Sequence, residues 1–348
     1  MFHRIESFGA EALHCFSDPD LGLRALIAIH DTRLGPAFGG SRFIPYVDED
    51  AAVDDVLKLA LGMTRKNALA GIPFGGGKGV IMRPDKGFER HDIFRRFGEI
   101  IDALGGQFVT AMDAGSETED MASIASASKY VAVADPGAHT ALGVAAAIET
   151  AIERRVANAT LAGASVAVQG LGHVGSKLCA QLAKRGARLI VTDFDRAKID
   201  EIVARYDAKA VSPGQIYEVD CDVFAPCALG GVLNEDTVAR LRCRIVAGAA
   251  NNQLACPAIA EALRARNILY APDYVINAGG VIFAALSYLG DSEVQILKKI
   301  NRIPLTLTQV LDLAERQRIT AEEAAEGLAR EILEGDAPDD TTAMLAAR

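Results

Sequence analysis

The sequence predicts an α/β protein of two domains, the second of them built on a doubly wound parallel sheet. Its 348 residues exceed what one hydrophobic core usually holds, and half of them are hydrophobic. Short apolar strands alternate with helical patterns in the second half, as in βαβ units. The breaker cluster Asp135-Pro136-Gly137 marks the boundary. We therefore expect one domain over 1–135, joined by a returning segment at about 320–348, and another over 136–319.

The first domain is expected to mix strands and helices. Apolar and β-compatible residues predict strands at 23–30, 37–46, 79–82 and 107–111. Asp48 or Asp50 is a candidate N-cap for a helix that runs to about Leu69, where Gly71-Ile72-Pro73 stops it. Two more helices are expected, one at 89–104 and one from Glu117 onward.

The second domain is expected to alternate between helices and strands. A helix over 140–156 precedes a strand at 165–169, a helix at 177–185 and a strand at 189–193. The alternation continues through segments at 223–225, 238–241, 245–247, 258–264 and 268–270. Long helices are expected from about Gly279, and a polar tail over 335–348.

Composition argues against several classes of function. A formal net charge of -10 disfavours nucleic acid or an acidic membrane surface as the main partner. No membrane span is expected, because no run of eighteen or more uncharged apolar residues occurs, and the first residues do not resemble a signal peptide. The six cysteines form no Cys-x-x-Cys pair, which is typical of reduced thiols in a cytoplasmic protein. The six histidines lack metal-ligand spacing, so no metal is expected.

A glycine motif predicts a dinucleotide site in the second domain. Gly170-Leu171-Gly172-His173-Val174-Gly175 lies between a predicted strand and a predicted helix. In such a loop the first glycine allows a tight turn, the second leaves room for a pyrophosphate, and the third lets the helix pack on the strand. The pyrophosphate then meets the free amides of the helix N-terminus.

Asp193 lies at the end of the next predicted strand, about 20 residues beyond the loop, where an acid accepts hydrogen bonds from an adenosine ribose. An acid there repels the extra phosphate of NADP, so NAD is the expected cofactor. A surface acid at a strand end is the alternative interpretation of Asp193.

Two lysines in the first domain predict a site for a small anion. Lys66 ends an apolar helical run, and Lys78 follows three glycines in Pro73-Phe74-Gly75-Gly76-Gly77-Lys78-Gly79. The segment is not a P-loop, because Ile72 and Gly79 stand where that motif needs Gly and Ser or Thr. We expect the glycines to let a ligand approach the backbone while Lys78 exchanges a proton and Lys66 binds a carboxylate. Solvated surface lysines are the alternative.

Asp113 is a candidate for proton transfer. It follows the predicted strand at 107–111 and precedes Ala114-Gly115. A carboxylate at the carboxyl end of a strand is well placed to exchange a proton with a bound ligand. A capping or turn acid is the rival interpretation.

The motifs that contain these residues resemble the Glu/Leu/Phe/Val amino-acid dehydrogenases. The resemblance rests on Met63-Thr64-Arg65-Lys66-Asn67-Ala68, Gly75-Gly76-Gly77-Lys78 and Thr110-Ala111-Met112-Asp113. It extends through Gly248-Ala249-Ala250-Asn251-Asn252-Gln253-Leu254 and the run from Tyr270 to Gly280. The length is similar to that of the leucine, phenylalanine and valine branch. The family implies reversible oxidative deamination of an L-amino acid to a 2-oxo acid and ammonia with NAD, in an active-site cleft between a substrate and oligomerisation domain and a Rossmann domain.

The resemblance also implies a role for each matching residue. Lys66 would bind the substrate carboxylate with help from the Gly39-Gly40 backbone, Lys78 would activate the attacking water, and Asp113 would shuttle protons to and from the amino group. The positions that match the nicotinamide side of the family's site are Thr140, Cys227, Ala228, Asn251 and Asn277, and Asn277 is also expected to contact the substrate. The family further implies a homo-oligomer.

The expected side-chain pocket favours an aliphatic substrate. Its matching positions are Phe38, Ala111, Val281 and Ala284. Ala111 and Val281 are similar to the leucine-type pattern, whereas Phe38 departs from it and narrows the pocket. A hydrophobic pocket discriminates one methylene by only about 1–3 kcal/mol, so leucine, valine and isoleucine are all expected substrates. An aromatic amino-acid dehydrogenase and a non-catalytic NAD-binding regulatory protein stay open as alternatives.

Overall fold

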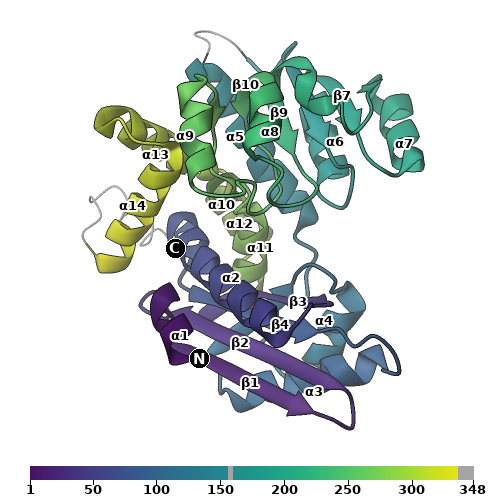
Figure 1. The fold of residues 1–348 in the computed structure, drawn as a ribbon, viewed down its shortest axis with the longest axis vertical. Coiled ribbons are helices and arrows are strands. Elements are labelled where there is room, and N and C mark those ends of the chain that lie inside the picture. Colours follow the sequence, from purple (N-terminus) through teal and green to yellow (C-terminus); the bar gives the residue numbers. More distant parts are fainter. Residues whose placement is uncertain (156–159, 336–348) are drawn as a thin grey trace. The chain divides into compact units, whose positions relative to one another are not determined.

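The computed structural model describes residues 1–155 and 160–335, and it divides into two compact units (Figure 1). The first unit comprises Met1–Asp135, Val281–Ile296 and the described residues from Ala329 on. The second unit comprises Pro136–Gly280 and Leu297–Leu328. The predicted two-domain α/β class is confirmed. Most of the tail expected at 335–348 lies outside the described residues.

The first unit is built on a mixed five-stranded sheet with the order β1-β2-β4-β3-β5. The β1–β2 and β2–β4 pairs are antiparallel, whereas β3 is parallel to both β4 and β5. Consequently β3, β4 and β5 all direct their carboxyl ends to the same edge of the sheet. The strands are β1 (Ala12–Asp18), β2 (Leu23–Asp31), β3 (Ala37–Ile44), β4 (Gly75–Met82) and β5 (Phe108–Met112).

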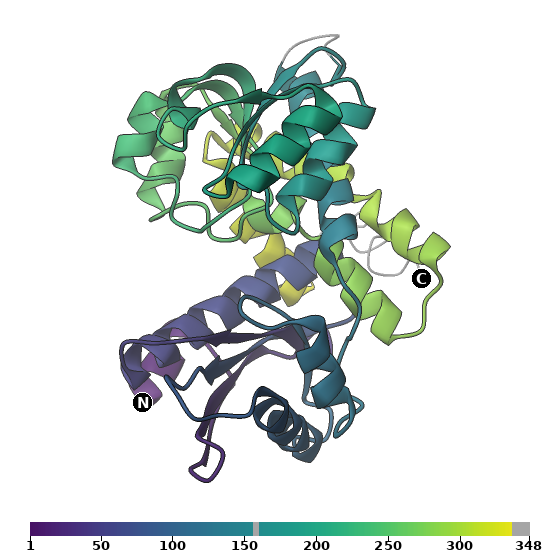
Figure 2. The ribbon, with the colours of Figure 1, turned by 90° about the vertical axis from the view of Figure 1, so that its right-hand side faces the viewer.

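Helices cover both faces of this sheet. The long helix α2 (Glu49–Ala70) begins at the N-cap Asp48, whose side chain accepts a hydrogen bond from the Ala51 amide. It ends at Gly71, which adopts the left-handed conformation that favours glycine (φ 62°). Figure 2 shows α2 on one side of the sheet and α3 on the other. The other helices of this unit are α1 (Phe2–Phe8), α3 (Arg90–Ala103) and α4 (Thr118–Ala125).

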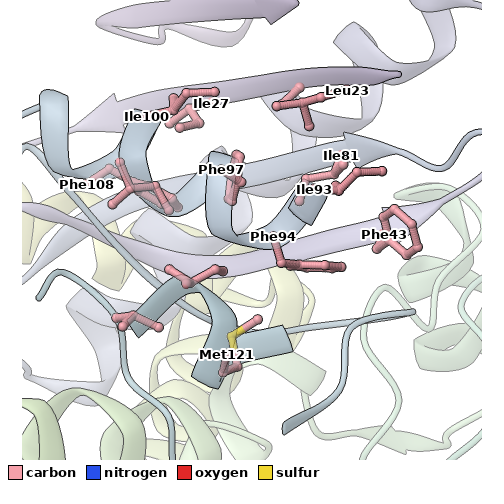
Figure 3. Packing of buried hydrophobic residues seen from close by; sticks show 14 of the residues in the cluster. Leu23, Ile27, Phe43, Ile81, Ile93, Phe94, Phe97, Ile100, Phe108 and Met121 are labelled. Carbon is pink, nitrogen blue, oxygen red and sulfur yellow. The ribbon is translucent and has the colours of Figure 1, made fainter. Parts of the chain in front are cut away.

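The two faces have separate cores. On one face, α3 and α4 pack against the sheet through Phe94, Phe97 and Met121, which meet Phe43 and Phe108 (Figure 3). On the other face, side chains of α2 such as Val56 and Leu57 pack against Val80 and Met82 of β4. Because side chains alternate along a strand, Lys78 belongs to the same face as Val80 and Met82.

The second unit contains a six-stranded sheet in which every pair of neighbours is parallel. The order β11-β10-β9-β6-β7-β8 reverses direction between β6 and β9. Ligands of open α/β sheets bind outside the carboxyl ends of the strands at such a switch point. The strands are β6 (Ser165–Gln169), β7 (Arg188–Thr192), β8 (Lys209–Ala210), β9 (Asp220–Pro226), β10 (Arg242–Val246) and β11 (Leu269–Tyr270).

Helices flank this sheet as well. Val238, Ile259 and Leu263 pack with Phe224 and Val246 of the strands. The second unit holds α5 (Gly137–Arg155), α6 (Gly175–Lys184), α7 (Arg196–Tyr206), a short 3₁₀ helix (Ile216–Glu218), α8 (Glu235–Arg240), α9 (Ala258–Ala265), α10 (Asp273–Ile276) and α13 (Ile303–Gln317). The helices α11 (Gly279–Tyr288), α12 (Glu293–Ile300) and α14 (Ala321–Glu334) contribute residues to both units.

The helices of the described residues lack the combination of length and apolar character that would let one cross a membrane. Within 1–155 and 160–335, no three His, Cys, Asp or Glu residues gather as a metal site would require.

Candidate active site

The structure brings Lys78 and Asp113 together. The Lys78 ammonium lies 2.9 Å from Oδ2 of Asp113, and its side chain is only 6% exposed. Lys78 lies in the middle of β4, whereas Asp113 directly follows β5. The two residues are therefore neighbours in space although 35 positions separate them along the chain. A buried ion pair of this kind is a candidate for moving a proton to and from a ligand.

The chain around Asp113 holds its carboxylate against the sheet. The Asp113 amide donates to Oγ of Ser116, and that hydroxyl donates to the Asp113 carbonyl oxygen, both at 2.9 Å. On the neighbouring strand, a Cβ on Gly40 would lie 2.7 Å from Cβ of Asp113. Only glycine fits at position 40, because any larger residue would displace the carboxylate.

Three residues that sequence analysis missed extend the pair into a network. Nε of Arg42 donates to Oδ2 of Asp113 at 3.1 Å, and Nη1 of Arg42 donates to Oδ2 of Asp55 at 2.9 Å. The Tyr46 hydroxyl donates to the same oxygen of Asp55 at 2.5 Å. Arg42 lies two residues after Gly40 in β3, so strand alternation places both on one face. That alternation was the only sequence signal for Arg42.

The network keeps Asp113 ionised. Burial raises the pKa of this carboxyl, but Lys78 and Arg42 outweigh burial and lower the pKa from 3.8 to about 2. Two cations, Lys78 and Arg42, are balanced by two carboxylates, Asp113 and Asp55. Asp113 is therefore negatively charged at neutral pH.

The glycines before Lys78 have a different role from the one predicted. We expected them to let a ligand approach the backbone. Gly75, Gly76 and Gly77 instead belong to the fully buried strand β4, and protein atoms fill the space beside them. A Cβ on Gly76 would lie 2.2 Å from the amide nitrogen of Thr64 in α2. Gly76 therefore allows helix α2 to pack directly on β4.

This close packing fixes the turn of α2 that carries Lys66. The buried side chain of Asn67 donates to the carbonyl oxygens of Phe38 in β3 (3.1 Å) and Gly75 in β4 (2.6 Å). Lys66, the preceding residue, is half-buried. The predicted Gly39 is equally constrained, because a Cβ there would lie 1.9 Å from the Gly77 carbonyl oxygen.

The residues predicted to line the side-chain pocket are apolar residues of the first unit, and most of them are buried. Phe38 is 1% exposed, and its ring lies 5.0 Å from that of Phe74, which in turn contacts Tyr288 of α11. Ala111 of β5 pairs with Gly40, and Ala284 of α11 is also buried. Val281 of α11 is half-buried. Phe74 therefore connects Phe38 of β3 with Tyr288, the last residue of the helix that carries Val281 and Ala284.

In the second unit, the three glycines of the loop differ in their surroundings. Gly170 has a positive φ of 94°, and a Cβ there would lie 2.8 Å from Cβ of Ala228. A Cβ on Gly175 would lie 2.0 Å from the Gly170 carbonyl oxygen, so helix α6 approaches β6 closely. A Cβ on Gly172 would meet nothing within 4 Å. The space beside Gly172 is thus available to a ligand, and the loop fits a pyrophosphate.

Asp193 is tied to this loop. Its Oδ2 accepts a hydrogen bond from the Leu171 amide at 2.6 Å, and its Oδ1 accepts one from the Asp195 amide at 2.9 Å. Burial raises the pKa of the Asp193 carboxyl, but these backbone donors outweigh it and lower the pKa. Asp193 is therefore a charged group beside the glycine loop. His173, within the loop, lies 3.2 Å from the Lys177 ammonium at the start of α6, and Val174 is the N-cap of that helix.

Of the remaining predicted cofactor residues, Cys227, Ala228 and Asn251 follow the carboxyl ends of β9 and β10, whereas Thr140 lies in α5. Cys227 follows β9, and its amide donates to the Gln169 carbonyl oxygen of β6 at 2.7 Å. Asn277 donates to Oδ1 of Asn251 at 2.9 Å. The Thr140 hydroxyl donates to the Pro136 carbonyl oxygen at 3.0 Å, beside Gly280. Burial raises the pKa of Cys227 to about 12, so its thiol stays protonated.

A buried lysine–aspartate pair in one unit and a glycine loop at the switch point of a parallel sheet in the other define a dinucleotide-dependent oxidoreductase. Comparison with known families gives the same answer. Residues 12–130 match the model of the Glu/Leu/Phe/Val dehydrogenase dimerisation domain, and residues 133–326 match the Glutamate/Leucine/Phenylalanine/Valine dehydrogenase model. The chain belongs to this family of NAD(P)-dependent enzymes and is an amino-acid dehydrogenase.

Its relatives include enzymes named for different amino acids. The chain is 42% identical to the leucine dehydrogenase of Bacillus subtilis (strain 168), over 96% of this chain and 94% of that one. It is 40% identical to the L-tryptophan dehydrogenase of Nostoc punctiforme, over 99% of both. The crystal structure of L-tryptophan dehydrogenase from Nostoc punctiforme superimposes with a TM-score of 0.85, covering 97% of this chain and 99% of that chain at 41% identity.

Proposed function

We propose that this enzyme uses NAD to oxidise a branched-chain L-amino acid, namely leucine, valine or isoleucine, to its 2-oxo acid and ammonia, reversibly. The observation that carries the proposal is the 2.9 Å contact between Lys78 and Asp113 in a buried position of the first unit. In balanced form, the amino acid, NAD⁺ and water give the 2-oxo acid, ammonium, NADH and a proton.

Each charged residue then has one task. Lys66 binds the substrate carboxylate as a point charge. Asp113, ionised beside Lys78, takes a proton from the substrate ammonium group and later returns one to the departing ammonia. Lys78 assists the attack of water on the imino carbon. When bound, the nicotinamide supplies the chemistry of hydride acceptance, and residues 170–175 together with Asp193 would hold its dinucleotide.

NAD is proposed over NADP because Asp193 is ionised next to the loop. The backbone amides that lower the pKa of Asp193 keep it negative at neutral pH. A fixed negative charge at the adenosine ribose disfavours the extra ribose phosphate of NADP by direct repulsion. Thr140, Cys227, Ala228 and Asn251 are proposed to line the nicotinamide end, with Asn277 reaching the substrate.

The proposed side-chain pocket supports an aliphatic preference. Phe38 is almost fully buried and makes the pocket narrower, whereas the small side chains of Ala111 and Ala284 leave room for a branched chain. A second candidate is an aromatic L-amino acid, which the L-tryptophan dehydrogenase relative favours. A pocket built from Phe and Ala discriminates such substrates only modestly, so the ratio between them has to be measured.

A substrate panel decides between these functions. NADH formation is followed at alkaline pH with leucine, valine, isoleucine, phenylalanine and tryptophan, each with NAD and with NADP. The proposal expects the highest kcat/KM with an aliphatic amino acid and NAD. A preference for phenylalanine or tryptophan would establish the aromatic alternative, and NAD binding without turnover of any amino acid would indicate a regulatory protein. We further propose that the enzyme is a homo-oligomer, which the dimerisation-domain match supports, and that it acts in the cytoplasm.

A further inference from the structure

We propose that Arg42 is a positioning residue of the active site: it holds Asp113 in one orientation, and Asp55 and Tyr46 hold Arg42 in turn. This inference rests on the proposed function, because it assigns the proton transfer to Asp113. It adds three residues from β3, α2 and the segment between them to the machinery of the reaction.

The geometry at the Asp113 carboxylate supports this role. Lys78 and Arg42 both approach Oδ2, at 2.9 and 3.1 Å. Among the described residues, no hydrogen bond reaches the other oxygen, Oδ1. Two donors on one oxygen fix the rotation of the carboxylate and leave Oδ1 for the amino group of a substrate. With Lys78 alone, the carboxylate would be free to rotate about its Cβ–Cγ bond.

Arg42 also lies between two carboxylates. Its Nε reaches Asp113 and its Nη1 reaches Asp55, so the planar guanidinium spans both. A lysine has one ammonium group and reaches only one of two separated carboxylates. The Arg42 side chain is 18% exposed and that of Asp55 is 27% exposed, so water screens these contacts only in part.

Asp55, the second carboxylate that Arg42 contacts, is itself held in place. Asp55 lies on α2, the helix that packs on β4 through Gly76 and carries Lys66. The Tyr46 hydroxyl donates to the oxygen of Asp55 that Arg42 also contacts. Because burial and the bond to Asp55 raise the pKa of Tyr46 well above its ordinary value, this hydroxyl remains a donor at working pH. Asp55 therefore has a fixed orientation, and its contact with Arg42 fixes the orientation of the guanidinium.

These contacts predict a kinetic signature that a merely structural residue would not give. The charged groups that face Asp113 are Lys78 from β4 and Arg42 from β3. Removing Arg42 removes one of two cations that stabilise the ionised carboxylate, so the Asp113 pKa rises. Activity on the acid side of the pH profile is then lost at a higher pH than in the unmodified enzyme.

The test compares Arg42→Gln, Arg42→Lys and Asp55→Asn with the unmodified enzyme. For Arg42→Gln we expect kcat to fall about 10- to 100-fold, because displacing a catalytic group by about 1 Å has an effect of that size. The KM for the amino acid and the affinity for NADH should stay within about threefold, and the acid limb of kcat/KM should move up by about one pH unit. In Arg42→Lys, the acid limb of kcat/KM should return to its position in the unmodified enzyme, whereas kcat should recover only in part.

Asp55→Asn should reduce kcat by a smaller factor. The double variant with Arg42→Gln should be no slower than Arg42→Gln alone, because Asp55 acts only through Arg42. The matched control is Arg96→Gln. Arg96 also joins two carboxylates in the first unit, those of Asp18 and Glu99, at 3.0 Å each, but lies in α3. Its replacement should leave kcat and the acid limb unchanged.

A folded Arg42→Gln enzyme with unchanged kcat and an unchanged acid limb would overturn the proposal. A double variant of Arg42→Gln and Asp55→Asn whose loss of kcat equals the product of the two single losses would also overturn it. If Arg42→Gln does not fold, Arg42→Lys and Asp55→Asn carry the same test. A carboxyl ¹³C titration of Asp113, assigned with Asp113→Asn and run without substrate, separates this inference from the proposed reaction. It should show a higher Asp113 pKa in Arg42→Gln even if no amino acid is oxidised.

Discussion

Gly175 approaches Gly170 so closely that a Cβ on Gly175 would lie 2.0 Å from the carbonyl oxygen of Gly170. The helix α6 therefore begins directly against the end of β6. Gly172, two residues into the loop, has no such neighbour, because its Cβ would meet nothing within 4 Å. One loop thus contains a glycine that folding requires and a glycine that folding does not require.

Alanine at these two positions should separate folding from cofactor binding. Gly175→Ala should lower the thermal unfolding temperature, since overpacking costs about 1–3 kcal/mol. Gly172→Ala should unfold at the unmodified temperature and bind NADH at least about tenfold more weakly, because its methyl group occupies the approach of the pyrophosphate. Differential scanning fluorimetry and NADH fluorescence titration measure both effects. Unaltered NADH affinity in Gly172→Ala would place the dinucleotide elsewhere.

Replacing Asp193 should change the cofactor preference. Asp193→Asn keeps a side-chain acceptor for the Leu171 amide, so the loop should retain its conformation while the negative charge is lost. The ratio of kcat/KM for NADP to that for NAD should rise by about tenfold or more, as expected from removing one charge repulsion. Initial rates with both cofactors give this ratio. A ratio that stays the same would mean that Asp193 does not face the adenosine ribose.

The pairing of Asp113 should appear in the pH dependence of stability. Its folded pKa of about 2 lies below the ordinary 3.8, so its contribution is present above pH 3.8 and is lost as the pH falls toward 2. The full contribution is on the order of 2 kcal/mol, of which about 1 kcal/mol is gone by pH 3. Urea unfolding at pH 5 and pH 3 measures it. The stability difference between the unmodified protein and Asp113→Asn should shrink by that amount, and a constant difference would rule out the pairing.

The sequence was sufficient for those parts of the fold that depend on local patterns. The strands 165–169 and 189–193, the capped helix after Asp48 and the glycine loop all lie where their patterns predicted. Lys78 and Asp113 were each predicted as site residues, but their direct contact was not, because Lys78 was expected to follow a glycine loop rather than to lie within a strand. Strand β1, whose residues are mostly half-buried, gave no strong periodic signal and was missed.

What the sequence could not show depends on contacts between distant segments. The run Gly75-Gly76-Gly77 has the composition of a loop, and only the packing of α2 at Thr64 explains why it forms a buried strand. The partnership of Arg42 with Asp113 spans 71 positions and has no local pattern beyond strand alternation. The helix α7 over Arg196–Tyr206 was likewise not predicted, because its surface is largely polar and few of its side chains are buried.

The most direct test of the central claim is NADH formation by the unmodified enzyme and by Lys78→Ala, with Lys58→Ala as the control for an exposed lysine on α2. We predict that the unmodified enzyme and Lys58→Ala oxidise an aliphatic L-amino acid at similar rates. Lys78→Ala should be slower by about 10²- to 10⁴-fold, the usual contribution of acid–base catalysis, while binding NADH normally. Turnover of Lys78→Ala at the unmodified rate would contradict the account.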